Sequence, residues 1–294
     1  MKQNLKRRVL LVLAFSTCLL LNYNPQAFFH SDYQHWGWNF SLLASVIIIL
    51  IIKYRDPENW KQKLGIDFNG KDIFGFLITT VVLIVISFYL VDYVAKLGNY
   101  SFKPRIFNFR RIIDPDCPLH TVLGTYAYYI PETFNEEMLI GAILLMGLER
   151  RFEKLNRNII AISVALIFSF MHQALYKYSP YQPGILLTAT TISTLFFVGI
   201  LRNVLILKTR KIAYSWAIHL SFNLVFFAGF FVNMSTGDFA SEPERFNIVF
   251  GSIIMLLLTG SLATISLIWL NINKGAPKST DLKYGSDYKE DKGN

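Results

Sequence analysis

Long apolar runs recur along the whole chain, and they constrain its fold more than any other feature. An α-helix needs roughly 20 mostly apolar residues to cross about 30 Å of hydrocarbon. Only 17% of the 294 residues are charged, whereas a typical soluble domain has about 25%. A chain in lipid must satisfy its backbone hydrogen bonds internally, so helices are the expected element. We therefore predict an all-α, polytopic bundle of transmembrane helices.

The apolar runs divide into eight predicted spans, of which the first two are the shortest. Residues 1–272 would then form one transmembrane helical domain. The tail 273–294 is polar and rich in Lys, Asp, Gly and Ser, so we expect it to be disordered and cytoplasmic. The predicted spans are residues 9–22, 40–52, 73–95, 121–147, 159–177, 184–207, 212–232 and 249–271.

The basic residues concentrate near the ends of the apolar runs, although the net charge is +9. That placement is typical of a protein in a lipid bilayer, whose cytoplasmic loops are rich in Lys and Arg. It predicts that both termini are cytoplasmic. The segment 96–120 disagrees, because it is basic but is predicted to lie outside. We find no phosphate-binding loop, zinc ribbon or RNA-binding signature, so nucleic acid is excluded as a partner.

Three sets of polar residues lie well inside predicted spans. They are the pair Glu136 and Glu137, the single His172, and the pair His219 and Asn223. A charged residue in a span costs at least about 2.5 kcal/mol on insertion scales, so each needs a reason. At 1.5 Å per residue, all three sets lie roughly 10 to 20 Å from the predicted inner end of their span. This shared depth favours one common site inside the bundle.

The residue types suit acid–base chemistry, but each has a structural alternative. Two adjacent carboxylates in a low dielectric cannot both ionise cheaply, which suits one of them to act as a general base or acid. A buried acidic pair or a packing histidine would be the structural interpretation. His219 and Asn223, four residues apart on one helix face, could instead form hydrogen bonds that hold neighbouring helices together. Arg202, in the sixth span, is interpreted as a side chain that snorkels to the membrane surface.

These motifs resemble those of the CAAX-protease and bacteriocin-processing (CPBP, or Abi) family of intramembrane proteases. The three signatures are Glu-Glu-x-x-x-Arg, Phe-x-x-x-His and His-x-x-x-Asn. Glu136-Glu137, Phe168-x-x-x-His172 and His219-x-x-x-Asn223 match them in order and on separate spans. The resemblance covers about residues 60–235. It departs at Gly141, where the arginine that orients the acidic pair would stand.

The resemblance implies a peptidase in a bacterial cytoplasmic membrane. Its substrate would be a peptide or a membrane-anchored protein. Glu136 would activate a water, His172 would orient that water, and Glu137 would position Glu136 or the histidines. His219 and Asn223 would donate to the oxyanion. No cofactor is expected, and a zinc ion held by a glutamate and two histidines is the alternative.

Two further functions stay open at this stage. Gly141 in place of an arginine favours a catalytically degenerate relative that acts in bacteriocin self-immunity or as a membrane partner protein. Glutamate and histidine inside a membrane also occur in transporters and proton relays. The chain has no repeated halves of the kind common in transporters.

Overall fold

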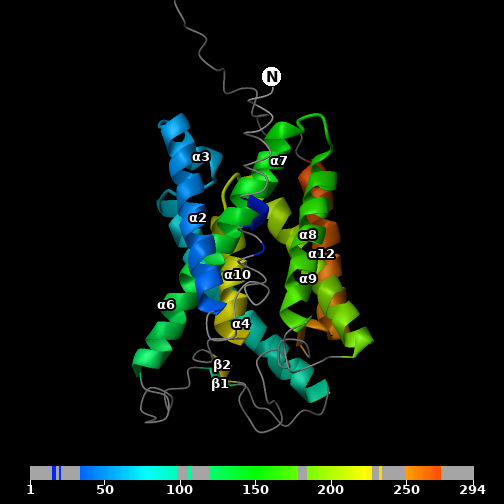
Figure 1. The fold of residues 1–294 in the computed structure, drawn as a ribbon. Helices are drawn as coiled ribbons and strands as arrows, with labels where there is room; N and C mark the ends of the chain where they lie inside the picture. Colours follow the sequence, from blue (N-terminus) through cyan, green and yellow to red (C-terminus); the bar gives the residue numbers. More distant parts are fainter. Residues whose placement is uncertain are drawn as a thin grey trace, which may run out of the picture.

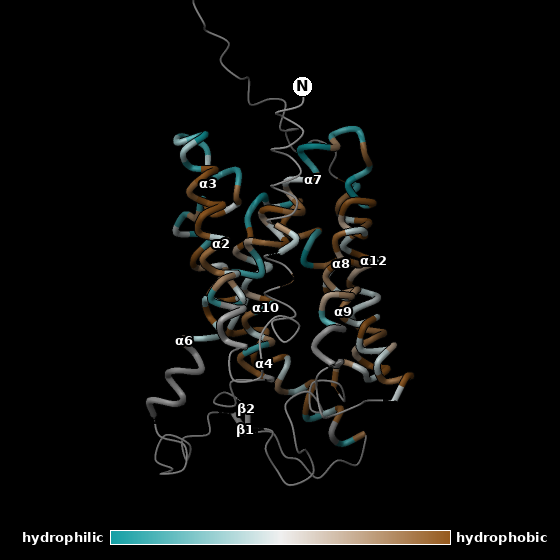
Figure 2. Tube along the Cα trace, in the orientation of Figure 1, coloured by the Kyte–Doolittle hydropathy of each residue, from teal (hydrophilic) through white to brown (hydrophobic). Residues whose placement is uncertain are grey.

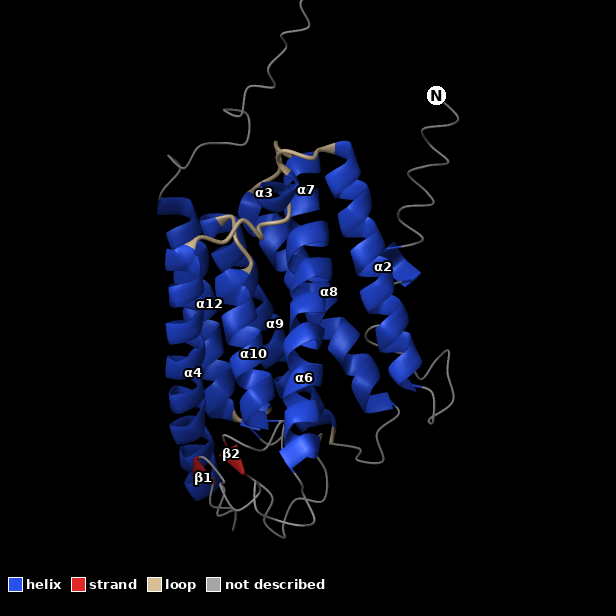
Figure 3. Ribbon diagram, turned by 90° about the vertical axis from the view of Figure 1, so that its left-hand side faces the viewer, coloured by secondary structure: helices blue, strands red, loops and turns tan. Residues whose placement is uncertain are grey.

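The computed structural model shows a bundle of helices that run side by side (Figure 1 and Figure 3). It describes residues 15–17, 20, 34–97, 105–106, 119–177, 184–226, 232–233 and 249–272. Helices dominate this part of the chain, which confirms the predicted all-α class. The helices are α2 (Gln34–Arg55), α3 (Trp60–Lys63), α4 (Gly70–Leu97), α6 (Leu119–Glu136), η3 (Glu137–Leu145), α7 (Met146–Arg151), α8 (Arg157–Lys177), α9 (Ile185–Thr209), α10 (Ala213–Phe226) and α12 (Ile253–Ile272). Two-residue strands β1 (Arg105–Ile106) and β2 (Val232–Asn233) pair antiparallel.

Three of the described helices are long and apolar enough to cross a membrane. These segments correspond to the third, sixth and eighth predicted spans. The count of eight spans stays a prediction. Most of the first predicted span, most of segment 96–120 and the whole tail 273–294 lie outside the described residues. The three spanning segments are Gly70–Val94 in α4, Ile185–Thr209 in α9 and Ile253–Ile272 in α12.

Hydrophobic residues recur along these helices (Figure 2), and many of their large apolar side chains are exposed. On α4, for example, Phe74, Leu77 and Val81 are each more than half exposed. Exposed apolar surface of this extent is unfavourable in water and costs nothing against hydrocarbon chains. The chain is therefore an integral membrane protein.

The segment that carries the acidic pair is helical throughout but changes its hydrogen-bond pattern at that pair. The α-helical part α6 ends at Glu136, and the π-helical part η3 begins at Glu137. Pro131 lies inside α6 and has no N–H to donate to the preceding turn. π-helical segments are rare in proteins. Where they are found, they are often part of a functional site. The sequence predicted a span over 121–147 but not this local change of helix type.

Helices α8 and α9 approach each other closely at Gly199. A Cβ atom at this glycine would lie 3.1 Å from Cβ of Ala165 and 3.2 Å from Cδ1 of Phe168. Nearby, Nδ2 of Asn203 donates a 2.8 Å hydrogen bond to the carbonyl oxygen of Ala161. Small residues and interhelical hydrogen bonds are the usual means by which membrane helices pack. This contact brings α9 against the face of α8 that carries Phe168.

A cluster of charged residues joins the helices at the end of the bundle that carries α3 and α7 (Figure 1). Glu149 pairs with Arg157, at 2.9 Å between Oε1 and Nε, and also with Arg210. Lys211 pairs with Asp72 at the start of α4. We call Asp72, Glu149, Arg157, Arg210 and Lys211 the end network. It holds the short turn between α9 and α10, and thereby sets where α10 begins.

Candidate active site

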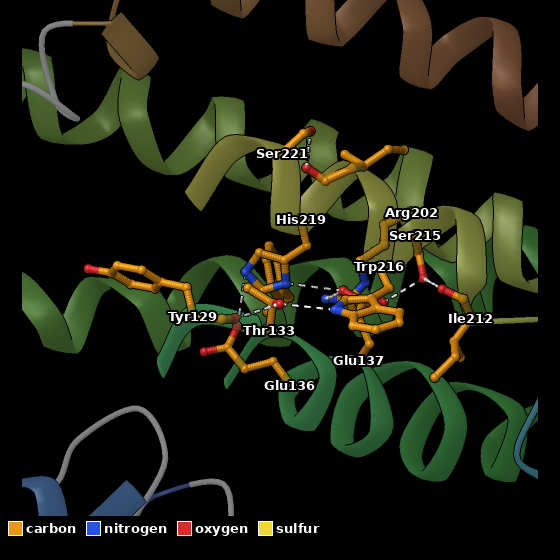
Figure 4. Close-up of polar contacts among 12 residues, drawn as sticks. Tyr129, Thr133, Glu136, Glu137, Arg202, Ile212, Ser215, Trp216, His219 and Ser221 are labelled. Atoms are coloured by element: carbon orange, nitrogen blue, oxygen red, sulfur yellow. Dashed lines mark hydrogen bonds and ion pairs between the residues drawn. The ribbon is translucent and has the colours of Figure 1, made fainter. Parts of the chain in front are cut away.

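The acidic pair lies inside the bundle at the junction of α6 and η3. Glu136 is 8% exposed and Glu137 is fully buried. Buried carboxylates are stable only with hydrogen-bonding or charged partners, so their contacts identify what the site contains. Figure 4 shows that the partners come from α10 and α9.

Glu137 is held by contacts to three side chains. Ser215 Oγ donates a 2.6 Å hydrogen bond to Oε2, and Nδ1 of His219 lies 3.2 Å from Oε1. Nη1 of Arg202 lies 3.5 Å from the same Oε1 atom. This carboxylate therefore has a neutral donor, an imidazole and a guanidinium around it, which suits its ionised form.

The His219 ring joins the two glutamates. Its Nδ1 faces Glu137, and its Nε2 lies 3.3 Å from Oε2 of Glu136. An ionised carboxylate can only accept hydrogen bonds, so Nδ1 donates to Glu137, whereas the contact of Nε2 with Glu136 is a close approach without a hydrogen bond. Figure 4 shows the ring between the two carboxylates. The structure thus brings together three of the five residues that the sequence singled out.

His172 approaches from α8. Its Nδ1 lies 2.8 Å from the carbonyl oxygen of Phe168. A carbonyl oxygen only accepts, so Nδ1 donates, and in the neutral ring Nε2 is then the acceptor. The ring packs on Phe168 with centroids 4.4 Å apart, and Phe168 also lies edge-on to His219 at 6.3 Å. Phe168 of the second motif therefore contacts both histidine rings.

Asn223 lies one helical turn beyond His219 on α10 and is half-buried. Residues four apart share a helix face. Ser215, one turn before His219, shares this face as well. The face of α10 that carries Ser215, His219 and Asn223 is thus the polar one, and Ser215 could have been found from that spacing.

Trp216 fixes α10 against α6. Its Nε1 donates a 3.0 Å hydrogen bond to Oγ1 of Thr133, which in turn donates to the carbonyl oxygen of Tyr129 at 2.9 Å (Figure 4). The indole ring packs against Phe76 and Phe134 with centroids 4.5 and 5.0 Å away. Thr133 precedes Glu136 and Glu137 by about one turn, so this bond aligns His219 with the acidic pair.

Arg202 is buried, which corrects the interpretation that it snorkels. It is 2% exposed, and its guanidinium carbon lies 4.5 Å from the centroid of the Phe168 ring. Snorkelling requires a path to the membrane surface, whereas this side chain points inward to Glu137. The sequence shows an arginine in an apolar helix, but not which way its side chain points.

Gly141 lies next to both α9 and the acidic pair. A Cβ atom placed there would lie 2.6 Å from Cδ1 of Ile206 and 3.6 Å from Oε2 of Glu137. The space next to Gly141 is therefore taken by a side chain of α9. Arg150, the next arginine along the chain, donates to the carbonyl oxygen of Lys63 at the end of the bundle instead.

The alternative mechanism requires residues that can bind zinc together. In the part of the chain that the structure describes, no group of three or more His, Cys, Asp or Glu residues is placed to share one metal ion. Glu136, His172 and His219 are thus close without forming the converging set that zinc requires. The expectation that no cofactor is needed stays a prediction.

Comparison with known proteins identifies the region that contains the site. Residues 118–225 match the family described as Type II CAAX prenyl endopeptidase Rce1-like. This match includes Glu136, Glu137, His172, His219 and Asn223, and it confirms the resemblance to the CAAX-protease family. The family is one of CAAX-type intramembrane endopeptidases. No curated protein matches the chain.

Proposed function

We propose that this chain, in which residues 118–225 form an Rce1-like domain, is an intramembrane endopeptidase that uses glutamate-activated water. The observation that carries the proposal is the His219 ring between Glu136 and Glu137 inside the bundle. Hydrolysis of an amide needs a base for the water and a donor for the developing oxyanion. A carboxylate next to an imidazole can supply both.

Glu136 is the general base in this proposal. Its carboxylate accepts a proton from water, and the water oxygen adds to the carbonyl carbon of the scissile peptide bond. The carbonyl oxygen becomes the oxyanion of a tetrahedral intermediate. When the intermediate collapses, the C–N bond breaks and Glu136 returns the proton to the leaving nitrogen. The carboxylate is thereby regenerated for the next turnover.

His219 and Asn223 are the oxyanion donors that we assign. Nε2 of His219 lies 3.3 Å from Glu136, so an oxyanion formed beside the base is within reach of this nitrogen. Asn223 follows on the same helix face and offers a side-chain amide. Removing one such donor in other hydrolases costs about 10²- to 10³-fold in rate.

His172 and Glu137 prepare the site. Because Nδ1 of His172 donates to the Phe168 carbonyl, Nε2 can accept a hydrogen bond from the attacking water. Glu137 contacts Nδ1 of His219 and so directs the opposite nitrogen toward Glu136. Each of these two residues therefore fixes an orientation rather than taking part in bond making.

The substrate that we propose is a peptide attached to the membrane, for which a prenylated CAAX C-terminus is the first candidate. The name of the matched family refers to prenyl endopeptidases. A lipid anchor holds a peptide at the bilayer, where a site among membrane helices can receive it. A leader peptide that enters the membrane is the alternative substrate of the same chemistry.

The experiment that tests this function is the substitution Glu136→Gln. Purified protein in liposomes would be given a quenched fluorescent peptide with a farnesylated CAAX C-terminus. We expect the variant to lose cleavage by about 10²- to 10⁴-fold, because the general base is gone. Glu153→Gln, the same change at an exposed glutamate after α7, is the matched control and should cleave as the wild type does.

The same pair of proteins tests the substrate class. Membranes from cells that express wild type or Glu136→Gln would be compared by mass spectrometry for a fragment that only the wild type produces. A wild type that produces no fragment and cleaves no peptide contradicts the proposed function. So does a Glu136→Gln protein with full activity.

Gly141 favours a second candidate, a non-catalytic relative that acts in self-immunity. Such a protein would keep the fold and need no base. If a variant with both Glu136→Gln and His172→Ala still protects cells against a bacteriocin, this second function is correct. If protection is lost while the protein still folds, the peptidase is supported.

A further inference from the structure

We infer that Arg202 on α9 positions the acidic pair, as the counter-cation of Glu137 supplied from a neighbouring helix. The inference rests on the proposed function, because the orientation of the acidic pair affects the rate only if the pair takes part in catalysis. It assigns a role to a residue outside the three sequence motifs.

Burial is the first support. Arg202 is 2% exposed and Glu137 is fully buried, so neither charge has access to water. Taking two charges out of water is costly unless they compensate each other. The 3.5 Å separation between Nη1 and Oε1 makes Glu137 the carboxylate that compensates Arg202.

The second support is the geometry around Gly141. The space that a side chain at this position would need contains Cδ1 of Ile206, at 2.6 Å from the Cβ position. Ile206 and Arg202 are four residues apart and share one face of α9. The helix face that fills the space beside Gly141 therefore also brings the guanidinium to Glu137. The guanidinium lies at Oε1 of Glu137, whereas a Cβ atom at 141 would lie at Oε2 of the same carboxylate, so both positions border Glu137.

The third support is the contact with Phe168. The guanidinium carbon lies 4.5 Å from the centroid of this ring, an attractive cation–π distance. The same ring contacts His172 and His219. Arg202 thus touches Glu137 on one side and, on the other, the aromatic ring that both histidines pack against. A shift of Arg202 would be transmitted to the base, the donor and the water-orienting residue.

The hydrogen bonds of the Arg202 guanidinium show what kind of contact it makes with Glu137. Within the described residues, Nε, Nη1 and Nη2 have no hydrogen-bond partner. The contact with Glu137 is therefore electrostatic rather than a bidentate hydrogen bond. A positive charge at this place matters more than the shape of the guanidinium, so lysine should replace arginine in part.

A double-mutant cycle tests the inference. The variants are Arg202→Met, Glu137→Gln and the two together, and the readouts are kcat, KM and melting temperature in detergent with the farnesylated CAAX peptide as the probe. We expect Arg202→Met to lower kcat about 10²-fold with KM within about 3-fold, because a small misplacement of reacting groups costs this much. We expect the double variant to match Glu137→Gln within about 3-fold, because Arg202 acts through that carboxylate.

Arg202→Lys is the rescue variant. It should recover at least about 10-fold of the kcat that Arg202→Met loses, since it restores the charge. If Arg202→Met alone does not fold, the charge-balanced double variant decides the question through its comparison with Glu137→Gln.

Three outcomes overturn the inference. The first is a folded Arg202→Met protein with wild-type kcat. The second is a double variant whose loss equals the product of the two single losses, since Arg202 would then act independently of Glu137. The third is a wild type that cleaves nothing, which contradicts the proposed function itself. In the first two cases the proposed function stands, because the wild type still cleaves and Glu136→Gln does not.

Discussion

The bundle contains two sets of arginine–carboxylate pairs in very different surroundings. In the end network, the side chains of Arg210 and Glu149 are 36% and 11% exposed. In the interior, those of Arg202 and Glu137 are 2% and 0% exposed. The residue types are the same in both, but the interior pair has almost no access to water and lacks the direct hydrogen bond that joins Arg210 to Glu149.

This difference in exposure determines what each pair can contribute. A pair that water screens contributes little to stability, and its loss is easily tolerated. A pair without water is costly to form, and removing one partner leaves an uncompensated charge. The end network therefore joins helix ends at little cost, whereas each partner of the interior pair depends on the other for compensation of its buried charge. Four substitutions test this comparison.

The largest effect is expected for Arg202→Met. Removing the guanidinium leaves Glu137 buried without its cation, which typically costs about 3–5 kcal/mol of stability. Unfolding by a denaturing detergent, followed by helix content, would measure the loss. Arg202→Lys should recover part of it. A loss below about 1 kcal/mol would show that Glu137 tolerates burial without Arg202.

A smaller effect is expected for Ser215→Ala. The substitution removes a 2.6 Å hydrogen bond to the carboxylate of Glu137, and bonds to charged groups contribute about 1.5–3 kcal/mol. Ser221→Ala is the matched control, because both serines are buried in α10 and their Oγ atoms lie within hydrogen-bonding distance of the carbonyl oxygen three residues earlier, but only Ser215 contacts Glu137 (Figure 4). Equal losses for the two variants would contradict a specific role for the bond to Glu137.

The third effect is that of Arg210→Met, the same substitution as at Arg202 but in the end network. Arg210 is about one third exposed, so the loss of its pair with Glu149 should cost about 0–1 kcal/mol. The same unfolding measurement applies, and cleavage activity should be unchanged. Should Arg210→Met destabilise the protein as much as Arg202→Met does, exposure would not be what separates the two sets of pairs.

The smallest effect concerns Asp56, in the loop after α2. The hydrogen bond from Lys63 holds the pKa of this carboxyl below its ordinary value of 3.8. Because the pKa is depressed in the folded state, the stabilisation is fully present above pH 3.8 and is lost as the pH falls through the lower, folded-state value. In Lys63→Met this pH dependence should weaken. Melting temperatures between pH 3 and pH 5 for both proteins would detect it.

Several features of the fold follow from the apolar pattern alone. The segments in α4, α9 and α12 are uniformly apolar and long, so their span character is independent of their neighbours. The apolar pattern predicts neither the π-helical part that begins at Glu137 nor the packing of α6 on α10, which includes the bond from Trp216 to Thr133. A one-dimensional pattern does not contain that contact.

The sequence singled out those residues of the candidate site that belong to a motif. Glu136, Glu137 and His219 were singled out by spacing and meet in the structure. Ser215 has the same spacing to His219 and was missed because serine is common in membrane helices. Arg202 was misinterpreted for a physical reason. Its helix is long and apolar enough to cross a membrane, so the position of α9 against η3 decides whether the side chain points to lipid or to Glu137.

The close contact at Gly141 also affects what a substitution at this position would do to its neighbours. An arginine at 141 would collide with Ile206 and add a second cation near Arg202, so the single substitution is disfavoured by its background. Cδ1 of Ile206 is the end of a flexible side chain, so a small movement or a smaller residue there would relieve the contact, whereas the second cation would remain. Substitutions at 141, 202 and 206 are therefore expected to have non-additive effects. If Arg202 has the role that we infer, the glycine at 141 does not by itself leave the acidic pair without a cation.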